Sequence, residues 1–387
     1  MTEATRRAHL WPARWATYAL FLGNGLGIGA WAAAIPGLKA RLPLTDAQLS
    51  LVLLAFAVGA IISMPLAGFF VARTGTRKAC FWAALAFALA LFLPPCAASL
   101  SGLMGVALLL GLSNGALDVS MNAYAGQLEQ KWGGAIMSSF HAVFSFGGLL
   151  GAALGALFSS LSGRDASSLV LWIPALLACG LALCARPFLG DDVAPAKRAP
   201  MAWSIPSRVT LLLGAIALLY MLVEGAMADW SGVYLASIGD ATRAAAGYGA
   251  FSLTMMIGRL TGDRAVNVFG RTKIIQLGGV LSLVGLVIAA LAPNEFWAIP
   301  GFALVGLGLA NVVPSVFSAA ARLGQNAAAG VAMVATAGYT GFLAGPPMIG
   351  MVASMSGLRS AMGLLAVASG LVVVLALFTL NRPDSKA

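Results

Sequence analysis

The chain has 387 residues, of which 60% are apolar and only 9% are Asp, Glu, Lys or Arg, whereas a typical soluble domain has roughly 25% charged residues. This composition excludes a water-soluble globular protein, and the net charge of +10 does not require a nucleic-acid partner, because basic residues also hold the cytoplasmic loops of membrane proteins in place. The apolar runs are about 20 residues long, which suits spanning helices and not the alternating strands of a barrel. We therefore expect an all-α polytopic membrane protein whose partner is the lipid bilayer.

Apolar stretches of spanning length recur along the whole chain. They lie near 15–36, 47–71, 79–96, 100–125, 135–160, 168–187, 208–237, 245–262, 273–292, 296–320, 328–352 and 360–380. Because these twelve segments are even in number, both termini are expected on the same side of the membrane. The first segment follows Arg6 and Arg7 and ends in small residues, as a secretory signal does, but the many later segments favour a retained first helix.

The distribution of basic residues predicts which side that is. If the N-terminus is cytoplasmic, 18 Lys and Arg residues fall on the cytoplasmic side and 5 on the other, which accounts for all 23. The larger set includes Arg73, Arg77, Lys131, Arg259 and Arg271, and the smaller set is Lys39, Arg41, Arg164, Arg243 and Arg359. Cytoplasmic loops are enriched in Lys and Arg, so both termini are expected in the cytoplasm.

The chain also shows an internal repeat. An offset of 194 residues aligns Gly68 with Gly262, Arg77 with Arg271, Gly147 with Gly341, Gly151 with Gly345, and Ser162 with Ser356. The longest hydrophilic stretch, near 187–207, contains four prolines and lies at mid-chain. We expect a six-helix bundle over 1–187, a cytoplasmic linker over 188–207 and a second six-helix bundle over 208–387. Two such halves suit a transporter that rocks one half against the other.

The turn between the second and third segments carries a recognisable motif. Gly68, Arg73, Gly75 and Arg77 match the cytoplasmic signature of the major facilitator superfamily, which this turn resembles. The acidic position of that signature is Ala72 here, and the first of its late basic positions is Thr76. A second copy keeps the acid, with Asp263, Arg264 and Arg271. The alternative interpretation is a tight basic turn that only enforces topology.

Longer runs resemble a narrower branch. Residues 115–123, 138–148 and 224–231 are similar to the YbjJ-like and MosC-like inner-membrane proteins, which are akin to fucose permeases. The resemblance implies the major facilitator fold, the bacterial inner membrane, and a small polar solute such as a sugar or an inositol-like compound.

One ionisable residue in the membrane stands out. Asn114, Asp118 and Asn122 are spaced by four, so they form one stripe along a helix. A central Asp costs roughly 2.5–3.5 kcal/mol to insert, so it needs a reason to be there. A buried carboxylate can exchange a proton near neutral pH. We expect proton coupling at Asp118, and the resemblance implies the same, since fucose permeases carry a protonatable carboxylate at this position. A structural Asp bonded between helices is the alternative.

Further polar residues follow along the chain. His141, in the next segment, is expected at the depth of Asp118, where the two side chains could share a proton; a His satisfied by its neighbours is the alternative. Glu224 is expected to contact proton or solute, with Tyr220 on the same helix face. Asn24 and Asn311 are candidate solute ligands or helix-packing residues, and Asn114, Asn122 and Tyr220 are further candidate solute ligands. Asp229 and Trp230 are expected to form an outer gate or an interfacial anchor.

The chain lacks the motifs of other activities. It contains neither a Walker P-loop nor a Gly-x-Ser-x-Gly or His-Glu-x-x-His motif. The four cysteines have no metal-ligand spacing and are expected to be small core residues. We therefore expect a monomeric secondary transporter that is not an enzyme and has no cofactor or metal, with the proton as coupling ion. Efflux by proton antiport is the alternative within transport, and a non-transporting sensor or scaffold is the alternative outside it.

Overall fold

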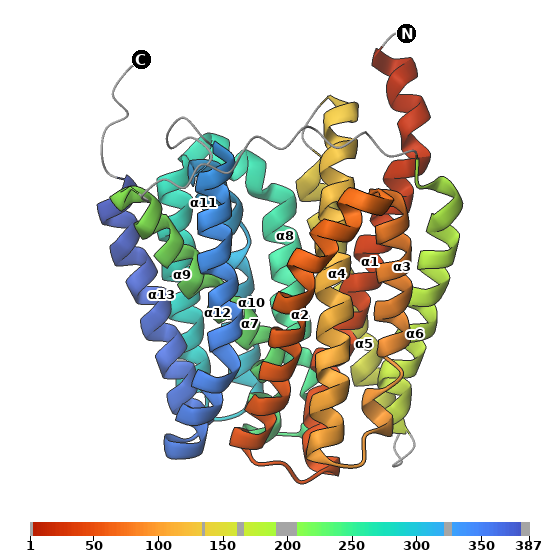
Figure 1. Ribbon diagram of the computed structural model, residues 1–387. Coiled ribbons are helices and arrows are strands. Elements are labelled where there is room, and N and C mark those ends of the chain that lie inside the picture. Colours follow the sequence, from red (N-terminus) through yellow and green to blue (C-terminus); the bar gives the residue numbers. More distant parts are fainter. Residues whose placement is uncertain (1–2, 134–135, 161–165, 191–206, 321–326, 381–387) are drawn as a thin grey trace.

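The computed structural model describes residues 3–133, 136–160, 166–190, 207–320 and 327–380, and their regular structure is helical (Figure 1). The first half of the chain forms α1 (Glu3–Arg41), α2 (Asp46–Thr74), α3 (Thr76–Ala90), α4 (Leu100–Trp132), α5 (Met137–Ser160) and α6 (Ala166–Ala185). The second half forms α7 (Arg208–Ile238), α8 (Ala245–Phe269), α9 (Arg271–Leu291), α10 (Glu295–Leu309), α11 (Val312–Ala320), α12 (Ala327–Ser356) and α13 (Leu358–Leu380).

These helices confirm the all-α membrane fold. Ten segments of the described chain are long and apolar enough to cross a bilayer, and α10 with α11 counts as one of them. Pro314 explains the break between α10 and α11, because proline cannot donate to the carbonyl four residues earlier. The 25-residue α8 and the 30-residue α12 are also of spanning length. The linker, expected over 188–207, lies mostly outside the described residues, so the domain boundaries stay predictions.

The two halves pair their helices in the same way. In the first half α1 packs against α5 and α6, and α4 packs against α2 and α3. In the second half α7 packs against α12 and α13, and α10 packs against α8 and α9. Between the halves, α2 contacts α12 and α5 contacts α8. Each half thus contributes its second and its fifth spanning segment to the interface, as the 194-residue repeat implies.

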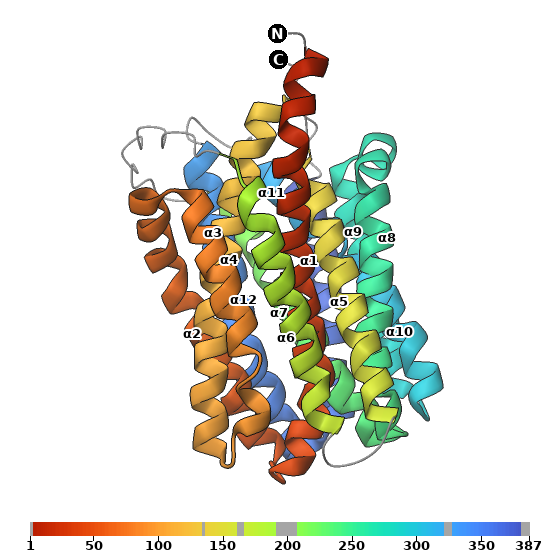
Figure 2. The ribbon, with the colours of Figure 1, turned by 90° about the vertical axis from the view of Figure 1, so that its right-hand side faces the viewer.

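Glycines at equivalent positions make these pairings possible. A side chain at Gly147 of α5 would meet the Leu22 carbonyl of α1, and one at Gly341 of α12 would meet the Leu218 carbonyl of α7. Small residues allow helix backbones to approach closely inside a membrane. Figure 2 shows α5 running beside α1 along the bundle.

The signature turns also correspond. Gly75 ends α2 at φ 83° and ψ 158°, and Gly270 ends α8 at φ 78° and ψ 156°. This backbone region is essentially reserved for glycine. Each glycine directly precedes the next helix, so its backbone conformation allows the chain to reverse direction at the equivalent turn of each half.

Replacing Gly270 by alanine should destabilise the protein by about 1–3 kcal/mol, from backbone strain. No atom lies within 4 Å of the new methyl group, so the loss of stability reports the cost of the positive φ angle and not a steric collision. Thermal unfolding of the purified protein measures it. Gly105→Ala is the matched control, because Gly105 also has open space but no positive φ, and an equal loss of stability in both variants would contradict the prediction.

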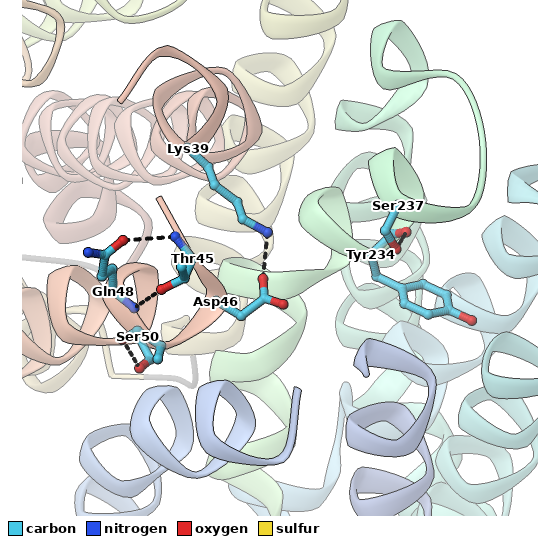
Figure 3. A network of polar contacts seen from close by, with 8 residues as sticks. Lys39, Thr45, Asp46, Gln48, Ser50, Tyr234 and Ser237 are labelled. Atoms are coloured by element: carbon cyan, nitrogen blue, oxygen red, sulfur yellow. Dashed lines mark hydrogen bonds and ion pairs between the residues drawn. The ribbon is translucent and has the colours of Figure 1, made fainter. Parts of the chain in front are cut away.

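The bundle has two distinguishable ends. α1 begins and α13 ends at the same end, which we call the terminal face; the other end is the opposite face (Figure 1). At the opposite face the halves are in contact, because Gly350 of α12 lies against Ser50 and the Asp46 carbonyl of α2. The α1–α2 connection there is fixed by a Lys39–Asp46 ion pair of 2.5 Å and by a capping box between Thr45 and Gln48 (Figure 3).

Candidate functional site

Polar side chains of the first half converge near the midpoint of α4. The Asn24 amide of α1 donates to Asn114 Oδ1 at 2.8 Å. One turn further along α4, Asn122 Nδ2 donates to Asp118 Oδ1 at 3.0 Å. The predicted stripe of Asn114, Asp118 and Asn122 therefore exists, and two of its members are engaged with each other.

Asp118 also bonds across the two halves. The Tyr339 hydroxyl of α12 donates to Asp118 Oδ2 at 3.1 Å. Tyr339 lies well inside the 30-residue α12, and Asp118 well inside the 33-residue α4, so this contact lies at mid-depth in the bundle. A carboxylate in this position can hold the halves together, contact a solute, or take up a proton.

A second polar contact between the halves lies at a similar depth. Arg259 Nη2 of α8 lies 3.3 Å from Glu224 Oε1 of α7, and Arg259 Nη1 donates to Ser145 Oγ of α5 at 2.9 Å. One guanidinium thus joins a carboxylate of its own half to a hydroxyl of the other half. The Ser145 hydroxyl in turn donates to the His141 carbonyl at 3.2 Å. We call Asn24, Asn114, Asp118, Asn122, Ser145, Glu224, Arg259 and Tyr339 the central polar layer.

The charged pair of this layer is partly exposed. The side chains of Arg259 and Glu224 are 14% and 23% exposed although both lie near the midpoints of long helices. Charged side chains in a bilayer face the bundle interior or a water-filled cavity, since exposure to lipid is costly. A cavity of about 750 Å³ lies elsewhere, at the opposite face between the ends of α1 and α7.

The structure does not place His141 on Asp118. The His141 ring packs against Phe21 of α1 with centroids 5.3 Å apart. Within the described residues Asp118 bonds to Asn122 and Tyr339, and no hydrogen bond joins it to His141. A shared proton between Asp118 and His141 stays a prediction that these contacts do not support.

Other candidates have different surroundings. The Tyr220 hydroxyl is buried and donates to the Gly308 carbonyl of α10 at 3.1 Å, and Asn311 Nδ2 donates to the Gly258 carbonyl of α8 at 2.8 Å. Both side chains therefore join helices of the second half. Trp230 is fully buried, which does not fit an interfacial anchor in the headgroup region. The alternative prediction, an outer gate that involves Asp229 and Trp230, stays a prediction.

The signature residues lie at the terminal face. Arg73 is in the last turn of α2, Arg77 in the first turn of α3, and Arg271 begins α9. Gly68 lies within α2, Gly75 ends it, and Arg264 lies near the end of α8. Asp263 belongs to α8, but its side chain lies outside the description.

Sequence reasoning missed three residues of the layer, namely Ser145, Arg259 and Tyr339. Arg259 was assigned to the cytoplasmic set of basic residues, but it lies near the midpoint of α8, which extends to Phe269. Because α8 continues beyond the predicted end at 262, a residue near the cytoplasmic end of the predicted segment lies near the middle of the helix. No pattern in the sequence marked Tyr339 as a candidate site residue.

The cysteines differ from expectation. Among the four, only Cys80 is buried, whereas Cys96 and Cys184 are exposed, so the prediction that all four are core residues was wrong for these two.

Comparisons with known proteins agree with this fold. The sequence profile of the Major Facilitator Superfamily matches residues 17–339. An uncharacterised MFS-type transporter of Yersinia pestis is 38% identical over 90% of each chain. The membrane protein MosC of Rhizobium meliloti is 35% identical, over 94% of this chain and 89% of its own.

Solved structures show the same architecture. A variant of the nucleoside transporter NupG aligns with a TM-score of 0.76 and 14% identity, over 96% of this chain and 100% of its own. An inward-facing, unoccupied bacterial homologue of the human lysosomal transporter Spinster aligns with a TM-score of 0.72 and 13% identity, over 98% of each chain. At these identities the likeness concerns the fold alone.

Proposed function

This chain belongs to the major facilitator superfamily, and from that premise we propose that it moves a small polar solute across the membrane together with protons. Proteins of this superfamily are transporters and not enzymes. The observation that carries the proposal is the central polar layer, in which groups of both halves meet at mid-depth and the charged pair is partly exposed. Alternating access would expose this layer first to one side and then to the other.

The charge of the layer supports a neutral solute. Glu224 and Arg259 compensate each other, which leaves Asp118 as the acidic group whose described bonds come only from a hydroxyl and an amide. A proton on Asp118 makes the layer electrically neutral. Amides, a carboxylate and a guanidinium recognise hydroxyl groups well, so a sugar or a cyclitol is the solute class that fits.

The location follows from charge and from relatives. The basic residues of the signature turns lie at the terminal face, which we therefore assign to the cytoplasm. The opposite face, where Gly350 lies against Ser50, would then be the outer face, and this contact between the halves would help to close the path to the outside. Bacterial relatives make the inner membrane the expected location.

Uptake into proteoliposomes tests the proposal. Purified protein is first screened by thermal shift against neutral monosaccharides, cyclitols, nucleosides and amphiphilic drugs, and the best stabiliser is then radiolabelled. Symport predicts accumulation when the outside is acidic, whereas antiport predicts accumulation when the inside is acidic. A sensor or scaffold predicts binding without movement. If the stabilising solute crosses at the rate of empty vesicles under either gradient, transport of that solute is excluded.

A further inference from the structure

The cavity of about 750 Å³ at the opposite face lies between the two halves. Its first-half wall includes Lys39 near the end of α1 and Phe158 near the end of α5. Its second-half wall includes Ser237 near the end of α7 and Ala245 at the start of α8. In Figure 3 the Lys39 side chain lies beside the end of α7 that carries Ser237. A molecule that fills this space would contact both halves at once.

The internal repeat shows that the two seams between the halves differ at this face. The offset of 194 relates Ser50 of α2 to Ala244, which directly precedes α8, and Gly350 of α12 to Ala156 of α5. At the α2–α12 seam Gly350 lies against Ser50. At the equivalent α5–α8 seam Ala244 lines the cavity. The halves thus touch at the end of one seam and enclose a space at the end of the other.

Tight packing separates this space from the central polar layer. Gly249 of α8 lies against Leu149 and Ala152 of α5, and a side chain at Gly232 of α7 would meet Pro36 of α1. These contacts lie between the cavity and mid-depth, because each residue is closer to the middle of its helix than the wall residues are. The cavity is therefore a separate site and not an extension of the layer that we assign to the solute.

The lining of the cavity is mostly apolar. Leu38, Leu44, Phe158, Val170 and Val233 supply alkyl and aromatic surface. Sites for small molecules in proteins occupy roughly 300–1,000 Å³ and combine such a lining with few polar groups. The size and the lining together favour an organic molecule with an aromatic or aliphatic body.

The charged side chains that line the cavity are both cations. Lys39 is paired with Asp46. Arg41, in contrast, donates to backbone carbonyls in the 94–97 turn. Carbonyl oxygens do not neutralise a guanidinium, and a guanidinium has more N–H donors than these bonds use. Arg41 can therefore still bind a carboxylate, the anion that best matches its planar fork.

The described acids near the cavity are already engaged. Asp240 caps the Thr242 amide, and Glu295 forms an ion pair with Arg243. Neither of these acids lines the cavity, and neither reaches Arg41 by a described bond. The charge at the wall thus favours an anion and disfavours a cation.

We propose that this cavity binds an amphipathic organic anion, an aromatic carboxylate from the aqueous side, which bridges the two halves at the opposite face. Rocking of the halves would separate its two walls, so the anion binds the arrangement in which they are close. It shifts the equilibrium toward that arrangement by its difference in affinity. Binding itself needs no transport activity, whereas the effect on rocking rests on the proposed function.

Calorimetric titration tests the binding step. The protein in phosphatidylcholine nanodiscs is titrated with biphenylacetate, and empty nanodiscs give the blank for partition into lipid. We expect saturable binding with a dissociation constant of roughly 0.1–1 mM, as for a well-fitted ligand of this size. Biphenylacetamide, the neutral counterpart, should bind at least about tenfold more weakly, because it lacks the charge that Arg41 recognises.

Variants of the cation locate the anion. Arg41→Gln should weaken binding of biphenylacetate at least about tenfold, whereas Arg41→Lys should keep most of the affinity. Arg359→Gln is the matched control. Arg359 is also exposed at this face and donates to a backbone carbonyl, that of Ala292, but it does not line the cavity. Its loss should leave binding unchanged.

A filled cavity gives an independent location. Gly37 lines the cavity, and no atom lies within 4 Å of its Cβ position, so Gly37→Phe adds a ring there without a collision of its Cβ. This variant should bind at least about tenfold more weakly. Gly105→Phe places the same ring at another open position of the first half, outside the cavity, and should bind as the parent protein does.

Bridging is tested from the other seam. A side chain at Gly350 would meet Ser50, so Gly350→Val pushes α12 away from α2 and should weaken binding at the distant α5–α8 seam at least about threefold. Gly363→Val, at an open position of α13, should not. Thermal unfolding verifies that each variant is folded, and Gly350→Ala, a milder change in the same direction, replaces a variant that is not.

Four results would each overturn the inference. They are the absence of saturable heat with biphenylacetate, parent-like affinity in both Arg41→Gln and Gly37→Phe, parent-like affinity in Gly350→Val, and loss of binding in nanodiscs rich in phosphatidylglycerol. The last, measured at high ionic strength to screen the lipid charge, would assign the cavity to a lipid. Solute uptake measured without any carboxylate decides separately whether the proposed transport function holds.

Discussion

Asp118→Asn should abolish proton-driven accumulation of solute while leaving the fold intact. The amide oxygen can still accept from Asn122, and the new NH2 group can donate to the Tyr339 hydroxyl oxygen, so both contacts of the carboxylate, at 3.0 Å and 3.1 Å, keep a hydrogen-bonding counterpart. An amide side chain, however, cannot take up and release the coupled proton. An inward gradient of one pH unit supports about tenfold accumulation for one proton per solute, because each 1.4 kcal/mol is a factor of ten. The variant should bring the accumulation ratio to about 1.

The informative measurement compares accumulation with exchange in the same vesicles. Counterflow, in which labelled solute exchanges for unlabelled solute, needs no net proton movement and should persist in the variant. Asp240→Asn is the matched control, because Asp240 is an exposed carboxylate at the opposite face that caps the Thr242 amide. Unchanged accumulation in Asp118→Asn would show that the coupled proton is carried elsewhere.

Gly25→Val should prevent the protein from folding into a stable bundle. A Cβ at Gly25 of α1 would collide with the Phe144 carbonyl of α5, and backbone atoms of a packed helix cannot move aside as a flexible side chain can. Overpacking a tight interface costs about 1–3 kcal/mol and sometimes more, and here we expect at least about 3 kcal/mol. The readout is the fraction of monodisperse protein after extraction in detergent, with the thermal unfolding midpoint of what remains.

Gly37→Val is the control for this variant. Gly37 lies on the same helix, but no atom lies within 4 Å of its Cβ position. Both variants carry the same change in helix propensity, which favours valine over glycine, so their difference measures the collision alone. Equal behaviour of the two proteins would show that the α1–α5 contact is looser than described.

Much of the fold could be predicted because a membrane imposes a simple rule. Every spanning segment must be a long apolar helix, so the segment near 208–237 matches α7 closely, and the segment near 100–125 begins where α4 begins although α4 continues to Trp132. Errors occurred where polar residues lie inside a helix. The segment predicted over 245–262 continues as α8 to Phe269, with Asp263 and Arg264 inside the helix.

The site was predictable where one helix carries the pattern. The spacing of Asn114, Asp118 and Asn122 places them on one face of α4, whatever surrounds that helix. Contacts between helices far apart in sequence have no such signature. Tyr339 is an isolated polar residue among small ones, and only the packing of the halves brings it to Asp118. The internal repeat does relate these interface residues, because an offset of 194 aligns Tyr339 with Ser145. Each of these two side chains forms a hydrogen bond with a residue of the other half.

Solute-induced proton movement is the most direct test of the central claim, which is that the central polar layer couples a proton to a neutral solute. Proteoliposomes are loaded with a pH-sensitive dye, no pH gradient is imposed, and the solute found by thermal shift is added outside in radiolabelled form, so that solute entry and lumenal pH are both followed. The account predicts prompt acidification of the lumen with the parent protein and none with Asp118→Asn. Solute entry without any change of lumenal pH in the parent protein would contradict it.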